Sequence, residues 1–248
     1  MFLAGYPCPE PLTGAAAFGD DVATAEAYVP GGAVFPSGDD PARAFAEAFA
    51  WLIWLAPRPA EVPTLDPAPS WAAWNHAGGG LWPCPEDLDV SLNEVAGAEW
   101  IDDAGRWARD RLRAGESEAV IGHCDWLAGN LRWSGDALLV VHDWDSVTAD
   151  SEAVLAGFAA ALWRPDPAGS AEGLATVEDT ERFLVAYCHA RGREFSAGEL
   201  QRSWAAGVWT RAYDAKCQHA AGEPITSLSE NEARERLRRT GTRPSRFA

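Results

Sequence analysis

The segment VIGHCDWLAGNLRW, residues 120–133, and the segment VVHDWDS, residues 140–146, decide how this chain is interpreted. Each contains an apolar run typical of a buried strand, and polar residues follow where the run ends. Asp125 and Asn130 lie in the first segment, and Asp143 lies in the second. A Ser-Gly-Asp turn signal separates the two runs, so a hairpin would return Asp143 to the side of Asp125 and Asn130.

Two carboxylates and an amide at this spacing suit phosphoryl transfer from a nucleotide. One carboxylate must reach the attacking hydroxyl group, and an amide oxygen with a second carboxylate must hold Mg²⁺ against the phosphates. A lone Asp125 would be taken for a turn residue, but its spacing to Asn130 and Asp143 favours a functional role.

The segments HCDWLAGN and HDWD resemble the catalytic loop and the metal-binding strand end of the aminoglycoside phosphotransferase family. The similarity extends over most of the chain, through the segments AGYPCPEPL and VATAEAYVPGG and through the helical residues 179–213. The resemblance implies an α+β, protein-kinase-like fold with a mostly helical C-lobe and part of the N-lobe sheet. It also implies a small-molecule kinase that uses ATP or GTP, Mg²⁺ and a hydroxyl acceptor.

The resemblance assigns roles to four residues of the loop and hairpin. Asp125 would be the catalytic base or would orient the acceptor, and His123 would support catalysis by bracing the loop. Asn130 and Asp143 would be the Mg²⁺ ligands. Asp145 is equally compatible with a place near the metal and with a hydrogen bond that supports the loop.

The resemblance also divides the chain. Residues 1–32 would be a remnant of the N-lobe strands with the hinge, and residues 33–248 would be the helical C-lobe with the catalytic loop and hairpin. Around Glu26, Ala27 and Tyr28, main-chain groups of the hinge would bind adenine.

The chain departs from the family pattern in two respects. Cys124 and Leu127 replace the usual glycine and a frequent histidine in the loop. Lys216, the single lysine, follows the catalytic loop and cannot be the phosphate-binding lysine of the family's N-lobe. The chain is therefore expected to be either truncated at its N-terminus or diverged, and its catalysis is in question.

Periodicity predicts helices on both sides of the catalytic segments. Asp39 or Asp40 would cap a helix that starts at Pro41, and a second helix would span residues 94–115. Residues 57–93 have no clear period and predict an irregular connection. After Ser151 the chain again predicts helices, one of which starts with a capping box at Ser196.

Composition narrows the function classes. The formal net charge of −17 over 248 residues makes binding to nucleic acid or an anionic membrane improbable, and it suits a cationic acceptor as well as mere solubility. The 5 cysteines form no C-x-x-C motif, so the sequence indicates neither a disulfide framework nor a zinc site. This favours the reducing cytoplasm as the location of the protein. No signal peptide or membrane-spanning segment is predicted. Most of the 13 tryptophans are expected in the core.

Two alternatives remain at this point. A non-catalytic relative would keep the helical lobe and bind a ligand or partner, and the missing lysine favours it. A metallohydrolase would use His123, Asp125, His142 and Asp143 as ligands to a transition metal, but this hypothesis leaves Asn130 unexplained.

Overall fold

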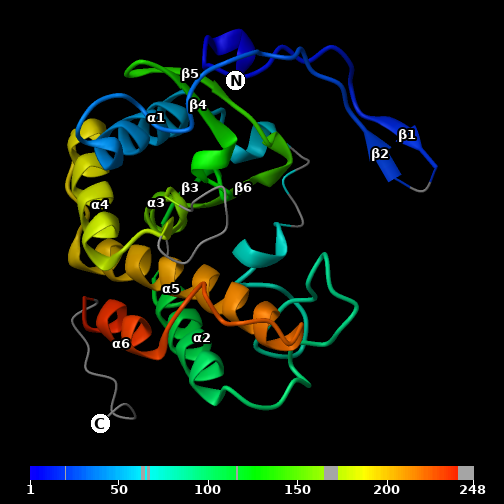
Figure 1. Cartoon of the computed structure of the whole chain (residues 1–248), viewed down its shortest axis with the longest axis vertical. Helices are drawn as coiled ribbons and strands as arrows, with labels where there is room; N and C mark the ends of the chain where they lie inside the picture. The colour runs from blue at the N-terminus through cyan, green and yellow to red at the C-terminus, as the bar shows by residue number, and fades with distance from the viewer. Residues whose placement is uncertain (20, 63–64, 66–67, 116, 165–172, 240–248) are drawn as a thin grey trace.

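The computed structural model describes residues 1–19, 21–62, 65, 68–115, 117–164 and 173–239. Short strands and α1 lie at one end of the molecule, and α2, α5 and α6 lie at the other (Figure 1). The helices are α1 (Pro41–Leu55), α2 (Glu99–Leu112), α3 (Glu152–Leu162), α4 (Val177–Arg191), α5 (Ala197–Ala220) and α6 (Glu230–Arg239). The strands are β1 (Ala16–Phe18), β2 (Asp21–Ala23), β3 (Ala119–His123), β4 (Leu131–Ser134), β5 (Ala137–Val141) and β6 (Val147–Ser151).

The strands form three antiparallel pairs, β1 with β2, β3 with β6, and β4 with β5. The predicted hairpin is confirmed, because β4 and β5 pair across a turn in which Gly135 has a φ of 62°. The N-terminal part of the chain joins this hairpin: the N–H of Val141 donates to O of Pro7 at 2.9 Å, and Ala33 pairs with Trp133. Strand β6 was not predicted, since the sequence indicated no element for residues 147–150, between the second polar segment and the helix expected after Ser151.

Two of the predicted helix starts are confirmed, and one is wrong. Oδ1 of Asp40 accepts a hydrogen bond from the N–H of Arg43, with Pro41 at the first helical position, and Ser196 forms the predicted capping box in α5. The predicted start of the second helix near residue 94 is wrong. Ala98 has a left-handed backbone with φ 50°, which ends any earlier helical turn, so α2 begins only at Glu99. Among the described residues, no helix has the length and apolarity to cross a membrane.

The core lies around α3, in which nearly every residue is buried. α3 packs closely on α5 because Gly157 meets the main chain of Ser203, where a Cβ atom would overlap the Ser203 carbonyl. Most of the 13 tryptophans contribute to the core, as expected, whereas Trp51 and Trp54 are exposed. Six are buried, namely Trp82, Trp126, Trp133, Trp163, Trp204 and Trp209, and five more are partly buried and pack against the core, namely Trp71, Trp74, Trp100, Trp107 and Trp144.

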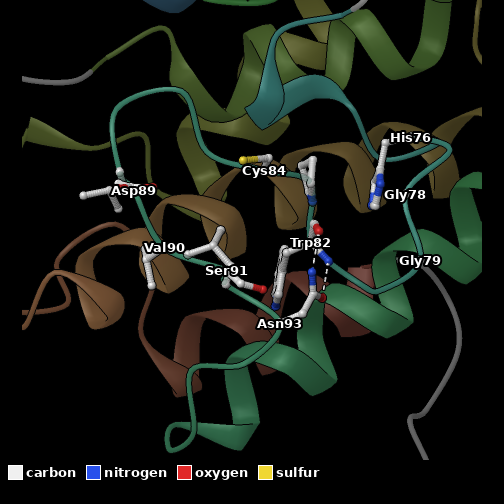
Figure 2. A pocket seen from close by; sticks show the side chains of 12 residues that line it. His76, Gly78, Gly79, Trp82, Cys84, Asp89, Val90, Ser91 and Asn93 are labelled. Carbon is white, nitrogen blue, oxygen red and sulfur yellow. Dashed lines mark hydrogen bonds between the residues drawn. The ribbon is translucent and has the colours of Figure 1, made fainter.

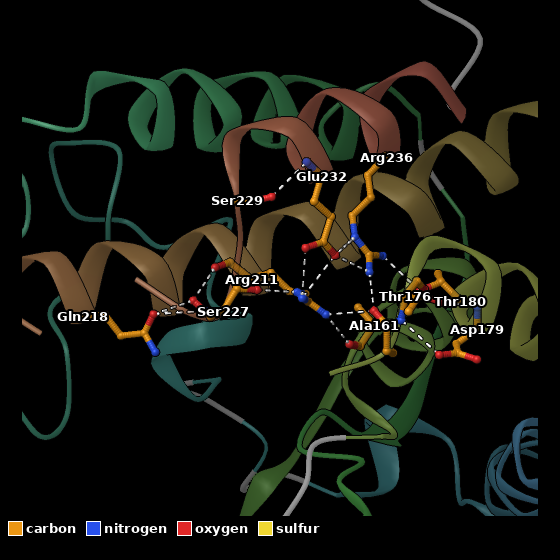
Figure 3. Close-up of polar contacts among 11 residues, drawn as sticks. Ala161, Thr176, Asp179, Thr180, Arg211, Gln218, Ser227, Ser229, Glu232 and Arg236 are labelled. Carbon is orange, nitrogen blue, oxygen red and sulfur yellow. Dashed lines mark hydrogen bonds and ion pairs between the residues drawn. The ribbon is translucent and has the colours of Figure 1, made fainter. Parts of the chain in front are cut away.

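Two buried arginines connect the C-terminal helices (Figure 3). Arg211 donates from Nε to O of Ser227 at 2.6 Å, and it pairs with Glu232 at 3.1 Å. Arg236 donates to the same Glu232 at 2.8 Å and to Oγ1 of Thr180 at 2.9 Å. Burial lowers the pKa of Arg211 to about 10, and the charge of Arg236 acts in the same direction. The guanidinium group of Arg211 is thus committed to the junction of α5 with α6.

Glu152, at the start of α3, connects this helix to α4 through a similar set of polar contacts. Its Oε1 accepts hydrogen bonds from the hydroxyl group of Tyr187 at 2.8 Å and from Nε of Arg191 at 2.7 Å, and its Oε2 pairs with Arg193 at 3.1 Å. Burial alone would raise the pKa of Glu152, but the hydrogen bonds from Arg191 and Tyr187 outweigh burial and lower it below 4.5.

We expect Glu152→Gln to lower the free energy of unfolding at neutral pH by about 2–3 kcal/mol, because it leaves partly buried donors without a charged partner. A lowered carboxyl pKa stabilises the fold above the unfolded value, and this contribution is lost as the pH falls through the folded pKa. The wild-type advantage should therefore shrink below pH 4.5. Urea unfolding above and below pH 4.5 measures the difference in free energy of unfolding between wild type and Glu152→Gln, and the exposed Glu118→Gln is the control. An advantage independent of pH would contradict this account.

Candidate functional site

The catalytic loop begins where β3 ends, and buried His123 holds its first turn. The N–H of Asp125 donates to Nδ1 of His123 at 3.2 Å, and Nε2 of the same ring lies 3.0 Å from O of His142. Since Nδ1 accepts, Nε2 must carry the proton and donate to the carbonyl group. Burial lowers the pKa of His123, so the ring stays neutral. Its geometry suits a brace between the loop and the hairpin.

Cys124 turns away from the loop surface. Its Sγ and its N–H both donate to O of Ser146, at 3.0 and 2.9 Å. Burial raises the pKa of the thiol far above its ordinary value, with a smaller contribution from the charge of Asp125. The side chain of Cys124 therefore packs inside the protein and cannot act as a nucleophile at neutral pH.

Asn130 carries its amide between two carboxylates. Its Nδ2 donates to Oδ2 of Asp125 at 2.8 Å and lies 3.3 Å from Oδ2 of Asp143. Asn130 ends a 3-10 turn before β4, and Asp143 follows β5 by two residues. The hairpin therefore brings together the three side chains that the sequence singled out.

The electrostatics of this cluster favour a bound cation. Burial raises the pKa of Asp125 to about 7; the hydrogen bond from Asn130 opposes this effect, and the charge of Asp143 adds to it. Burial also raises the pKa of Asp145, and the charge of Asp143 again contributes. Three carboxylates that repel one another are relieved by a positive charge among them.

Asp143 has an uncommon backbone conformation, with φ 65° and ψ 49°. Aspartate and asparagine enter the left-handed region more readily than other residues that have a side chain. This conformation starts the 3-10 turn Trp144–Ser146 and leaves the side chain of Asp143 exposed beside Asn130. Asp145, in the same turn, is also exposed.

The donor set fits a hard divalent cation such as Mg²⁺. Carboxylate and amide oxygens are its preferred ligands, and Mg²⁺ in nucleotide sites takes few protein ligands, because water and phosphate supply the others. Asp143 and Asn130 fit this role, since a half-turn of the Asn130 amide would present Oδ1 in place of Nδ2. The structure does not favour the metallohydrolase, because both ring nitrogens of His123 are engaged. Within the described ranges, no group of three His, Cys, Asp or Glu residues could hold a metal ion.

The predicted hinge residues lie in a segment that pairs with residues 10–13. Pro11 forms an antiparallel bridge with Glu26, and the N–H of Ala27 donates to O of Glu10 at 2.8 Å. That N–H group is therefore already used within the protein. Adenine binding by main-chain groups of Glu26, Ala27 and Tyr28 stays a prediction, and it would use groups other than this N–H. The side chain of Tyr28 is 85% exposed.

Lys216 lies in the helical part of the structure. Its Nζ donates to O of Val95 at 2.9 Å and pairs with Asp102 at 2.9 Å, and its side chain is 1% exposed. It therefore joins α5 to α2 and cannot contact a nucleotide at the catalytic loop.

A cavity of about 390 Å³ lies in the irregular region between α1 and α2 (Figure 2). Oδ1 of Asn93 accepts hydrogen bonds from the N–H groups of Leu81 and Trp82, which closes this region on itself. His76 and Asp89 line the cavity from opposite sides. None of the residues predicted for the catalytic site lines it.

Sequence reasoning missed two residues that interact with the loop. Nε1 of Trp71 donates to O of Cys124 at 3.3 Å. Burial raises the pKa of Asp214 of α5 to about 7, and the charge of Asp125 makes a smaller contribution. The signal for Asp214 was available, because an aspartate interrupts a long run of buried α5 residues. Nothing in the sequence around Trp71 distinguishes it from a core tryptophan.

Comparison with known proteins supports the fold. No sequence-family profile matches the chain, and a search of curated proteins found no match. A choline/ethanolamine kinase family protein from Mesorhizobium loti matches with a TM-score of 0.52 and 19% identity, over 97% of this chain and 74% of that chain. An amicoumacin kinase in complex with AMP-PNP and Ca²⁺ matches with a TM-score of 0.59 and 12% identity, over 97% of this chain and 72% of that chain. An ethanolamine kinase from Plasmodium vivax matches with a TM-score of 0.54 and 12% identity, over 97% of this chain and 69% of that chain.

The chain therefore has the fold of the protein-kinase-like small-molecule kinases, as its catalytic segments predicted. At these identities, the likeness concerns the fold alone.

Proposed function

We propose that this protein transfers the γ-phosphate of ATP or GTP to a hydroxyl group of a small molecule. One observation carries the proposal: the amide of Asn130 lies between the carboxylates of Asp125 and Asp143, at 2.8 and 3.3 Å. Phosphoryl transfer needs these groups at one point, one for the hydroxyl and two for the metal.

In the proposed reaction, Asp125 accepts the hydrogen bond of the acceptor hydroxyl group, aims its oxygen at the phosphorus and takes its proton. The N–H of Asp125 is held by neutral His123, which fixes the direction of the carboxylate. Asn130 and Asp143 would hold Mg²⁺, which supplies charge neutralisation on the phosphates when bound. AMP-PNP and Ca²⁺ in the amicoumacin kinase structure support the use of a nucleotide and a divalent cation.

Several finer assignments belong to the same proposal. Main-chain groups of Glu26, Ala27 and Tyr28 would bind the base, and the division near residue 32 would separate the hinge side from the C-lobe. The acceptor would be a small molecule, as it is for the kinases named above. The 5 free cysteines favour action in the cytoplasm.

The burial of Lys216 supports a second candidate, a protein that binds a ligand without turnover. The only lysine is tied to Asp102 and Val95, so it cannot stabilise charge on the phosphates. Nucleotide binding alone does not separate the two candidates, whereas ADP formation does.

Thermal unfolding with and without ATP or GTP and Mg²⁺ is the first test. A ligand at about 100 times its dissociation constant adds about 2.7 kcal/mol to the free energy of unfolding. We expect the unfolding midpoint to rise with nucleotide only when Mg²⁺ is present. EDTA should reverse the rise, whereas no shift with either nucleotide would contradict the proposed function.

A further inference from the structure

Ser146 is a buried hydroxyl residue beside two exposed carboxylates. It ends the short turn of residues 143–146, here called the acidic turn, and it is 3% exposed, whereas Asp143 and Asp145 are exposed. Its Oγ lies 3.4 Å from Oδ2 of Asp143 and 3.5 Å from Oδ1 of Asp145. A hydroxyl group has a single proton, and an ionised carboxylate only accepts, so Ser146 donates to one of these carboxylates at a time.

The main chain of Ser146 is fixed on both sides. Its O accepts hydrogen bonds from the N–H and from Sγ of Cys124, at 2.9 and 3.0 Å, and its N–H donates to O of Asp143 at 3.3 Å. The next residue, Val147, starts β6 and pairs with His123 of β3. A hydroxyl group on such a main chain can move only by rotation about one side-chain bond. The catalytic loop therefore sets where Oγ of Ser146 lies.

Two contacts hold the carboxylate of Asp143 through the same oxygen. Nδ2 of Asn130 lies 3.3 Å from Oδ2 of Asp143, and Oγ of Ser146 lies 3.4 Å from it. A carboxylate that is held through one oxygen presents the other oxygen in a restricted range of directions. If Asn130 turns its amide to offer oxygen to a metal ion, it stops donating to Asp143, and Ser146 then remains as a donor to this carboxylate.

Ser203 shows what a buried hydroxyl group does where it serves only the fold. Its Oγ donates to O of Glu199 at 3.2 Å and to O of Leu200 at 3.0 Å, within α5. Ser146 differs, because its hydroxyl group faces ionisable side chains. Hydrogen bonds to charged groups are about twice as strong as those between neutral groups, and replacement of a residue that orients a metal ligand typically lowers metal affinity by about 10- to 100-fold.

Resting on the proposed function, we propose that Ser146 is a positioning residue for the metal ion. Its hydroxyl group donates to Asp143 and keeps this carboxylate in the orientation in which, together with Asn130, it would hold Mg²⁺. The thiol of Cys124, through its bond to O of Ser146, supports the same arrangement from the catalytic loop. Both residues act through Asp143, so their effect should appear in the affinity for the metal ion.

The first test is the affinity of the full chain for AMP-PNP, measured by titration calorimetry over a series of Mg²⁺ concentrations. We expect Ser146→Ala to need at least about 10-fold more Mg²⁺ for the same affinity, with the weak binding in EDTA unchanged. Cys124→Ala loses the thiol but keeps the N–H bond to Ser146, and it should need about 3-fold more Mg²⁺. The matched controls are Ser203→Ala in α5 and Cys188→Ala in α4, both buried, which should keep the wild-type dependence on Mg²⁺.

A second readout needs no nucleotide. Mn²⁺, which prefers the same oxygen ligands as Mg²⁺, is titrated into the ligand-free chain, and free Mn²⁺ is measured by electron paramagnetic resonance. We expect Ser146→Ala to bind Mn²⁺ at least about 10-fold more weakly than wild type, and cooperative unfolding in EDTA shows that the variant is folded.

Equal dependence on Mg²⁺ and equal affinity for Mn²⁺ in Ser146→Ala and wild type would overturn the proposal, as would an equal loss in Ser203→Ala. If wild type binds no AMP-PNP with Mg²⁺, the proposed function fails, and the Mn²⁺ titration still decides whether Ser146 positions Asp143 for a cation. If wild type binds no Mn²⁺ either, both proposals fail.

Discussion

Replacement of Asp125 by asparagine is expected to lower the rate of phosphoryl transfer by about 10²- to 10⁴-fold, with nucleotide binding unchanged. The amide keeps the volume of the side chain, and its oxygen can still accept the hydrogen bond from Asn130. It cannot take the proton of the acceptor hydroxyl group, which is the step assigned to Asp125. The loss should therefore appear in kcat, whereas the dissociation constant for Mg²⁺ and nucleotide should stay close to that of wild type.

The measurement is the initial rate of ADP formation with an acceptor that wild type phosphorylates, alongside titration with AMP-PNP. Asp136→Asn is a suitable control, since Asp136 is exposed in the turn of the same hairpin. An Asp125→Asn variant with a rate near that of wild type would rule out Asp125 as the proton acceptor. If nucleotide binding fell together with the rate, Asp125 would instead belong to the metal site.

Asp143→Asn should abolish the Mg²⁺-dependent binding of nucleotide, with a loss of about 100-fold or more in affinity. Asparagine tolerates the left-handed backbone of residue 143, whereas alanine there would be strained. The variant thus removes the charge that holds the metal without a change in the hairpin. Its effect differs from that of Asp125→Asn, because binding itself should fail.

The test of Asp143→Asn is the affinity for AMP-PNP, measured for wild type and for the variant, once with Mg²⁺ and once with EDTA. Wild type should bind far more tightly with Mg²⁺, and the variant should bind equally weakly under both conditions. The free energy of unfolding without nucleotide should remain the same or rise, since removal of one of three neighbouring carboxylates relieves repulsion. Retained Mg²⁺ dependence in the variant would exclude Asp143 as a metal ligand.

Local patterns predicted much of the fold. The hairpin around Gly135, the cap at Asp40 and the capping box at Ser196 all depend on residues within one or two turns of each other, so the sequence shows them directly. β6 escaped prediction because its partner, β3, lies more than twenty residues earlier, and a short strand has no pattern of its own without its partner.

The grouping of the three proposed site residues could be predicted from the sequence alone. Asp125, Asn130 and Asp143 are close in the chain and are joined by a hairpin, so their spacing and the turn between them bring them together. The kinase-like fold was implied by the resemblance of the same segments to a known family.

The electrostatic state of the site could not be predicted from the sequence, because it depends on burial. His123 is neutral because its ring is buried between the main chains of the loop and the hairpin. Burial raises the pKa of Asp214 to about 7, although the charge of Arg211, its neighbour on α5 and a partner of Glu232 on α6, opposes this effect. Burial and charge pairing depend on contacts between distant elements, and one sequence read along its length does not contain those distances.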